Sequence, residues 1–410
     1  MPDWILPAIF GLSVFCCVYP YTVHPILSWL ILKLAPSRTA VAEEFNEAEL
    51  PTVTVIVPMH NEAASAQTKI ENTLEGQYPD HLIHLIVVAD HCTDDTEEQI
   101  SRCGDPRVSM IRSEGGNGKN HCLNQAVPMA EGEIIVMTDA SCALGPGAIR
   151  NMIRPFAKPE VGLVSIPKYQ VGTGQGSQGS QGGTLSKLRN AFLGFDSISK
   201  AAESKLGCLV GGIGALIAMR RSLWEAVPDD VCNDLQIPLR LVAQGHQVVT
   251  AQDVECLLGP SKSLGKEMAR RTRIISRSIR PATWALGQYL KRGRLAALFF
   301  LAGRKLAFYF APVFMILALV SNALLAPSGP IWLGLLVLQV ALYLLAFLGI
   351  KLSECGNPLA KLLGIPGQFL ALNLGVLTGL WYVLRHGHGM VTWSTAQRAI
   401  PGADKGPAAG

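Results

Sequence analysis

Long uncharged segments constrain this chain more than any other feature. Three of them, 306–326, 331–350 and 364–384, lie near the C-terminus, and a fourth lies between Asp3 and Lys33. At about 1.5 Å per helical residue, roughly 20 residues cross a hydrocarbon core of about 30 Å. We therefore expect a membrane protein. A mean hydropathy of +0.29 and 16% charged residues agree with that class.

The N-terminal apolar segment differs from the other three. Pro20 and Pro25 favour a kink or a re-entrant piece within it. It lacks the basic start and the small-residue cleavage site of a signal peptide, so we expect a permanent anchor. Lys33 and Arg38 follow it, whereas no basic residue precedes it. Because positive flanks stay cytoplasmic, we expect residues 35–300 in the cytosol.

Composition predicts five regions along the chain. These are an N-terminal transmembrane segment (1–34), an α/β domain (50–260), a basic amphipathic interfacial segment (261–300), three transmembrane helices (301–388) and a polar tail (389–410). The interfacial segment mixes basic and apolar residues, as membrane-surface helices do. The sequence has no basic stripe with interleaved aromatic residues, which is the pattern that would indicate nucleic-acid binding. Ten cysteines in no metal-like spacing predict a reduced compartment without a disulfide framework.

The region between the apolar ends alternates strand-like and helix-like runs. Strand-like runs occur at 53–57, 85–89, 108–111 and 134–138, and helix-compatible runs near 63–77, 94–103 and 119–129. This alternation is typical of an α/β fold with a mostly parallel sheet and helices on its faces. The stretch 172–183 has no apolar residue, and we expect a mobile loop there.

Two of the predicted strands end in acidic turns. VVADHCTDDT brings Asp90 to the end of one strand, and IIVMTDAS brings Asp139 to the end of another. Ligands of open α/β sheets bind just beyond the carboxyl ends of the strands. One acidic turn alone more often caps the next helix, so it is the pairing of the two that indicates a site.

These motifs, in this order, resemble the family 2 glycosyltransferases of GT-A fold, in the membrane-integrated branch of cellulose, hyaluronan and poly-N-acetylglucosamine synthases. The matching pieces, spread from residue 52 to about residue 280, are TVIVPMHNEA, VVADHCTDDT, NGKNHCLNQAV, VMTDAS, GGIGALIAMRRSLWEAVP, NDLQIPLRLVAQGHQVV and RRTRI. The resemblance implies a Rossmann-like GT-A domain joined to transmembrane helices.

The resemblance also implies roles for individual residues. These are nucleotide binding for Glu62, Asp90, Lys119 and Asp139, Mg²⁺ or Mn²⁺ binding for Asp139, general base catalysis for Asp234, and acceptor or diphosphate contacts for Arg270 and Arg273. A divalent ion would bridge diphosphate oxygens, and guanidinium groups suit phosphate because their fork is bidentate. Helix capping is the alternative role for Asp234, in competition with Asn233, and lipid anchoring is the alternative for the arginines.

Two departures from the family pattern bear on these roles. Ser141 stands where the metal motif usually has its second carboxylate, so water and diphosphate would supply more of the metal ligands. Ile274 stands in place of the tryptophan of the (Q/R)xxRW motif. That tryptophan forms a stacking wall for a sugar, so its absence affects processivity and acceptor position.

The resemblance implies an inverting transfer from a UDP-hexose or UDP-N-acetylhexosamine at the cytosolic face of the plasma (inner) membrane. A growing exopolysaccharide is the first expectation for the acceptor, because three apolar segments follow the basic one. The alternatives are a lipid acceptor, as for ceramide glucosyltransferase, and a non-catalytic subunit with a degenerate transferase domain. The presence of Asp90, Asp139 and Asp234 disfavours the last. Membrane lipids are expected partners and nucleic acid is not, while partner subunits stay undetermined.

Overall fold

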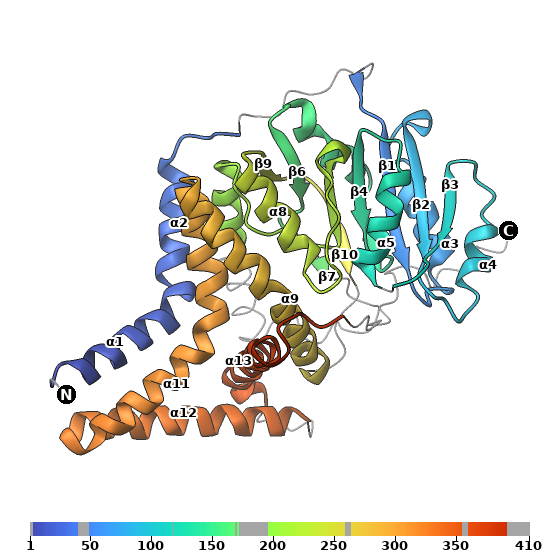
Figure 1. Cartoon of the computed structure of the whole chain (residues 1–410). Coiled ribbons are helices and arrows are strands. Elements are labelled where there is room, and N and C mark those ends of the chain that lie inside the picture. Colours follow the sequence, from blue (N-terminus) through green and yellow to red (C-terminus); the bar gives the residue numbers. More distant parts are fainter. Residues whose placement is uncertain are drawn as a thin grey trace.

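A computed structural model describes most of the chain, as an α/β domain from which long helices extend (Figure 1). The described residues are 3–39, 49–116, 118–168, 170–171, 196–258, 264–354 and 360–391. The expected loop at 172–183 and all but the first residues of the polar tail lie outside them.

The α/β domain is built on a seven-stranded sheet in the order β3-β2-β1-β4-β8-β6-β9. Its strands are β1 (Val53–Met59), β2 (Ile83–Ala89), β3 (Val108–Arg112), β4 (Ile134–Thr138), β6 (Val161–Ser165), β8 (Leu216–Arg220) and β9 (Gln247–Thr250). Neighbouring strands are parallel except that β8 is antiparallel to β4 and to β6. The predicted mostly parallel sheet is confirmed, and the four predicted strands are β1 to β4.

Helices cover both faces of this sheet. One face carries α3 (Ala66–Leu74), α4 (Thr96–Ser101) and α6 (Ala148–Ile153), and the other carries α5 (Lys119–Ala126) and α8 (Asn233–Gln244). Alternate residues of β1 enter the two cores: Val55 and Val57 face α3, whereas Ile56 faces α5. Every residue of β1 and β4 is buried. Burial on both faces explains why these strands are continuous apolar runs.

Short 3-10 turns connect several of these elements. They lie at Asp80–Leu82, Val127–Met129, Arg154–Ala157 and Arg221–Leu223.

A second, three-stranded sheet lies beside the first and is ordered β5-β10-β7. Its strands are β5 (Cys142–Leu144), β7 (Gln170–Val171) and β10 (Cys256–Leu258). A disulfide joins Cys142 to Cys256, whose Cα atoms are 6.2 Å apart and whose side chains are both 0% exposed. The expectation of no disulfide is therefore wrong for this pair. The two cysteines are 114 residues apart and meet only because β5 pairs with β10, so their spacing carried no signal.

The core on the α5 and α8 face continues into the helices that follow the domain. These are α9 (Leu264–Lys291), α10 (Leu295–Phe300), a π-helical stretch (Leu301–Leu306), α11 (Ala307–Leu325), the 3-10 turn Ala326–Ser328, α12 (Pro330–Glu354) and α13 (Ala360–His386). Tyr289 of α9, Phe300 of α10 and Val376 of α13 are each 0% exposed within this one core. The sheet and the long helices therefore share apolar packing.

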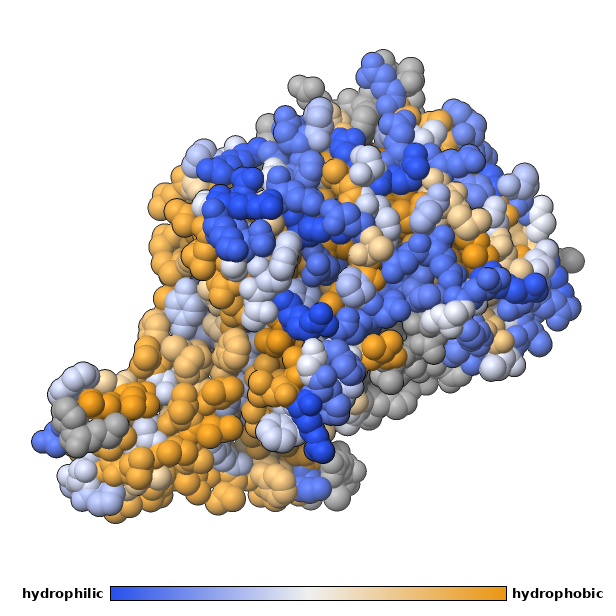
Figure 2. Space-filling view, in the orientation of Figure 1, coloured by the Kyte–Doolittle hydropathy of each residue, from blue (hydrophilic) through white to orange (hydrophobic). Residues whose placement is uncertain are grey.

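In the part of the chain that the structure describes, three helices are long and apolar enough to cross a membrane: Leu295–Ser328, Pro330–Leu352 and Pro366–His386. At the N-terminus, Ile5–Tyr21, comprising α1 (Ile5–Val18) and a 3-10 turn (Tyr19–Tyr21), meets α2 (Val23–Leu34) at a 45° bend, so the predicted kink is present. Figure 2 shows apolar side chains covering the long helices and polar ones covering most of the α/β domain.

A buried ion-pair cluster joins the π-helical stretch Leu301–Leu306 to the α/β domain. Arg304 donates to both carboxylate oxygens of Glu203, at 2.6 and 2.8 Å, and to Asp196 at 3.1 Å. Glu203 is 0% exposed and also accepts from the backbone nitrogen of Val210 at 3.1 Å. Breaking one side of such a buried pair costs about 3–5 kcal/mol. The helix is therefore held to the domain by charge as well as by apolar packing.

The disulfide closes a long loop and should stabilise the domain. We expect Cys256→Ala to lower the free energy of unfolding by about 2–4 kcal/mol, because the unfolded chain gains freedom. Thermal denaturation of detergent-solubilised protein measures this, with Cys122→Ala, a buried free thiol, as the control. Two results together would contradict the bond. The first is an equal melting temperature for Cys256→Ala and Cys122→Ala. The second is alkylation of both Cys142 and Cys256 in wild-type protein that has not been reduced.

Candidate functional site

Asp90 lies just beyond the carboxyl end of β2, as predicted, and it holds the start of α5. Its side chain is 1% exposed. Oδ2 accepts from the backbone nitrogen of Gly118 at 2.8 Å, and Oδ1 lies 2.9 Å from Nδ1 of His91. Gly118 has a φ of +103°, which glycine adopts without strain. These bonds place Lys119 as the first residue of α5, at the edge where β2 ends.

Glu62 follows β1 at the same edge of the sheet. Its Oε2 accepts from the hydroxyl of Ser65 at 2.9 Å, and its backbone nitrogen donates to the hydroxyl of Thr96 at 2.8 Å. Burial raises the pKa of the Glu62 carboxyl, while the Ser65 hydrogen bond lowers it. The charges of Asp94 and Asp139 raise this pKa further. Glu62 and Asp139 are therefore close enough to interact electrostatically.

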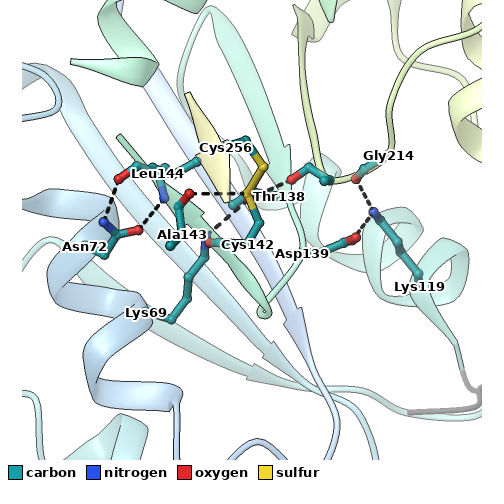
Figure 3. Close-up of a disulfide and its surroundings, with 11 residues drawn as sticks. Lys69, Asn72, Lys119, Thr138, Asp139, Cys142, Ala143, Leu144, Gly214 and Cys256 are labelled. Carbon is teal, nitrogen blue, oxygen red and sulfur yellow. Dashed lines mark hydrogen bonds and ion pairs between the residues drawn. A yellow bond between two sulfur atoms is a disulfide. The ribbon is translucent and has the colours of Figure 1, made fainter. Parts of the chain in front are cut away.

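Asp139 follows β4 and forms an ion pair with Lys119. The Nζ atom of Lys119 donates to Oδ1 of Asp139 at 2.5 Å and to the carbonyl oxygen of Gly214 at 2.7 Å (Figure 3). The Asp139 side chain is 40% exposed and that of Lys119 is 18% exposed. The carboxylate is therefore partly open to solvent while it holds the ammonium of Lys119.

Asp234 lies in the first turn of α8, but it does not cap that helix. The N-cap residue is Cys232, and no side chain there makes a capping hydrogen bond. Instead, Oδ2 of Asp234 accepts from the backbone nitrogen of Gly214 at 3.3 Å, and Oδ1 accepts from the Cys232 thiol at 2.6 Å. In the structure, therefore, neither Asp234 nor Asn233 caps α8.

Gly214 connects Asp139 with Asp234. Its nitrogen donates to Asp234, and its carbonyl oxygen accepts from Lys119, which is paired with Asp139. A Cβ atom at position 214 would lie 3.0 Å from Oδ2 of Asp234, so with any other residue the carboxylate would have to move by a few tenths of an ångström. Gly212 adds a hydrogen bond of 2.7 Å from its nitrogen to the carbonyl oxygen of Asp234. The glycine-rich segment therefore brings backbone against Asp234.

Arg273 reaches this site from α9. Burial lowers the pKa of its guanidinium, and the neighbouring Arg277 and Arg270 lower it further, whereas Cys232 and Asp139 raise it. Arg273 therefore lies within electrostatic range of Asp139. Arg270 lies about one turn earlier on α9. Arg277 has a different role, because it donates to the carbonyl oxygens of Val231 and Asp229.

The site contains few protein groups that could ligate a metal. Among the described residues, no three His, Cys, Asp or Glu side chains gather as a metal cage. Asp139 is the half-exposed acid that already binds a cationic group, and Ser141 lies two residues beyond it. This donor set fits Mg²⁺ or Mn²⁺ held by one carboxylate, water and a diphosphate, and it does not fit a closed protein cage.

Sequence reasoning missed three features near the site. One is Lys69 on α3, whose amine lies close to the Asp139 segment. A signal was present, since Lys69 shares a helical face with the buried Ala66, Ile70 and Thr73. The other two, the disulfide and the ion pairs of Arg304, depend on contacts between distant segments.

Comparison with known proteins gives concordant results. The sequence profile described as glycosyltransferase like family 2 matches residues 51–276. The mannosyltransferase PcManGT from Pyrobaculum calidifontis, solved in complex with GDP-Man and Mn²⁺, superposes with a TM-score of 0.65 at 23% identity, over 92% of this chain and 99% of that one. That likeness concerns the fold and supports the predicted GT-A architecture.

Two curated relatives match more locally. A beta-monoglucosyldiacylglycerol synthase from Nostoc sp. is 24% identical over 52% of this chain and 45% of its own length. The probable glycosyltransferase YdaM of Bacillus subtilis is 24% identical over 31% of each chain. The chain thus spans about half, or less, of the length of these relatives. Because the profile match covers more than half of the chain, the protein belongs to glycosyltransferase family 2.

Proposed function

We propose that this protein is a membrane-bound inverting glycosyltransferase that moves a sugar from a nucleotide sugar to a hydroxyl group at the membrane surface. The hydrogen-bonded path through Gly214 carries the proposal. It joins a cation-binding acid, Asp139, to a second acid, Asp234, which among the described residues neither caps a helix nor forms an ion pair. Sugar transfer requires these two functions side by side.

The reaction assigns one step to each group. Asp234 takes the proton from the acceptor hydroxyl, whose oxygen then forms a bond to the anomeric carbon of the sugar. The bond from that carbon to the diphosphate oxygen breaks, and the nucleoside diphosphate leaves. Attack opposite the leaving group inverts the anomeric centre, so a single carboxylate suffices as base.

Positive charge stabilises the leaving diphosphate. Lys119 forms an ion pair with Asp139, Arg273 lies within electrostatic range of Asp139, and Arg270 precedes Arg273 by about one turn of α9. Asp139, with Ser141, would hold Mg²⁺ or Mn²⁺, which supplies further positive charge to the diphosphate when bound. The Mn²⁺ and GDP-Man in the complex of PcManGT support this assignment. Glu62 and Asp90 would border the nucleoside.

A lipid acceptor, the alternative in the sequence analysis, now has more support than a growing polysaccharide. The relative from Nostoc sp. is named for a glucosylated diacylglycerol. A cavity of about 120 Å³ lies between α11, α12 and α13, and apolar residues such as Pro312, Leu370 and Leu374 predominate in its lining. Such a lining suits an acyl chain, whereas a polysaccharide needs polar or stacking groups.

Helix α13 lines this cavity and also packs against α9, the helix that carries Arg273. Leu374 of the lining is next to Gly375, whose carbonyl oxygen accepts from the hydroxyl of Thr272 at 3.1 Å. Thr272 precedes Arg273 on α9. A lipid chain in the cavity would therefore contact the helix that packs against α9. The three long helices after α9 support the polysaccharide alternative, as in synthases of the cellulose and hyaluronan branch.

We place the α/β domain at the cytosolic face of a multi-pass protein in the plasma (inner) membrane. The end of α2 lies against this domain, since Lys205 donates to the carbonyl oxygen of Leu32 at 2.8 Å. The backbone nitrogen of Arg38 donates to the carbonyl oxygen of Lys205 at 2.9 Å. The basic flank of the first segment and the site are therefore on one side, and basic flanks are cytoplasmic. Complete burial of the Cys142–Cys256 disulfide shields it from cytosolic reductants.

Asp234→Asn removes the proposed base without changing side-chain size. We expect a 10²- to 10⁴-fold loss of turnover, about the contribution of general base catalysis, with an unchanged melting temperature. Release of nucleoside diphosphate from a panel of UDP- and GDP-sugars measures this in detergent with Mg²⁺ or Mn²⁺. Asp253→Asn, at an exposed loop position, is the control. Unchanged turnover in Asp234→Asn would remove the assigned base.

Gly214→Ala tests the approach of backbone to the same carboxylate. The added Cβ lies 3.0 Å from Oδ2 of Asp234, so the carboxylate must move by a few tenths of an ångström. Because misplacement by about 1 Å can lower turnover roughly a hundredfold, we expect a smaller loss in kcat, about two- to tenfold. Gly287→Ala on α9 is the control, because a Cβ there meets no atom within 4 Å. Equal kcat values for the two variants would rule out the Gly214 contact as a catalytic requirement.

The acceptor class is decided by product size. With protein reconstituted in lipid nanodiscs and a radiolabelled nucleotide sugar, we expect label in a single lipid-soluble product bearing one sugar. Thin-layer chromatography and mass spectrometry of the organic extract identify it. Label retained in a high-molecular-weight, water-soluble polymer would instead support the polysaccharide acceptor.

A further inference from the structure

The segment that carries Asp139 is held from behind by polar side chains of α3. Lys69 is 0% exposed, and its Nζ atom donates to the carbonyl oxygen of Cys142 at 2.6 Å and to the hydroxyl of Thr138 at 3.2 Å. These two acceptors lie on either side of Asp139 in the chain. Figure 3 shows the amine of Lys69 below this segment, while Lys119 reaches Asp139 from the other side.

Two more side chains, Asn72 and Gln77, hydrogen-bond to the backbone that follows this segment. Asn72 accepts from the nitrogen of Leu144 and donates to its carbonyl oxygen, both at 2.8 Å. Gln77 donates to the carbonyl oxygen of Gly145 at 3.0 Å. The backbone after Asp139 is therefore fixed by side chains from one helix and the turn that follows it.

A buried lysine at this position costs free energy, because its charge must be desolvated. Its neighbours Ile70 and Leu74 are buried and apolar, and an aliphatic side chain would pack there without desolvating a charge. The pKa of Lys69 is lowered to about 7, mainly by burial, with Asp139 raising it and the charge of Lys119 lowering it. Its hydrogen-bond partners are neutral oxygen atoms. The two acceptor atoms are thus the main local reason for an amine here.

We propose that Lys69 is a positioning residue, which fixes the Thr138–Cys142 segment so that Asp139 and Ser141 face a divalent cation and the donor diphosphate. The inference rests on the proposed function. Outer-shell partners of metal ligands typically contribute 10- to 100-fold in metal affinity. Lys69 acts here through the backbone and Thr138, and it touches neither substrate nor metal.

Lys69→Met tests this role, because the two possible effects of the amine have opposite signs. Loss of positioning should weaken Mn²⁺ binding in the presence of UDP or GDP by about tenfold. Loss of a nearby positive charge alone would tighten it. Equilibrium dialysis and the Mn²⁺ spin-resonance signal measure binding independently of turnover. Lys291→Met, at an exposed position at the end of α9, is the matched control.

Thr138→Val is the second variant, in case Lys69→Met does not fold. It removes one acceptor of the amine, together with the donation of the Thr138 hydroxyl to the carbonyl oxygen of Ala215 at 2.9 Å, and keeps the charge and the side-chain shape. We expect weaker Mn²⁺ binding, with nucleotide binding in EDTA unchanged. Either of two results overturns this inference and leaves the proposed function standing: equal or tighter Mn²⁺ binding in Lys69→Met, or an unchanged Mn²⁺ affinity in Thr138→Val. Wild-type protein that binds neither nucleotide nor Mn²⁺ overturns the proposed function as well.

Discussion

The apolar core between the sheet and α8 is the constraint on which the rest of the structure depends. It extends without a break into α9, α10 and the long helices, where Tyr289, Phe300 and Val376 are all fully buried. Helices α8 and α9 carry Asp234 and Arg273, so the proposed base and the arginine assigned to the diphosphate are positioned by the same core that holds the long helices. The proposed site and the long apolar helices therefore share one core.

The site itself is organised by backbone more than by side chains. Asp139 and Asp234 make no direct contact, and Gly214 connects them by donating to one and accepting from the partner of the other. Asp90 contributes in a similar way, since it binds the nitrogen of Gly118 and so sets where Lys119 begins its helix. Glycine at these points permits approaches and dihedral angles that a Cβ would obstruct.

The sheet could be predicted from the sequence because burial on both faces leaves a plain apolar signature in β1 and β4. The acids at the strand ends were predictable for the same reason, since they interrupt those runs abruptly. The direction of β8 was not, because no residue in 216–220 specifies antiparallel pairing. Lys69 was overlooked because a charged residue in a helix usually faces solvent. The Cys142–Cys256 bond required the pairing of β5 with β10, which is a property of the fold and not of local pattern.

The charge balance of the site explains why few of its side chains could ligate a metal. The carboxylate of Asp139 is paired with the ammonium of Lys119. In the proposed reaction Asp139 and Ser141 would hold a divalent cation together with water and diphosphate oxygens, and Lys119 and Arg273 would supply further positive charge to the diphosphate. Lys119 also donates to the carbonyl oxygen of Gly214. Because the nitrogen of Gly214 donates to Asp234, the donor and acceptor sides of the proposed site would share one backbone segment.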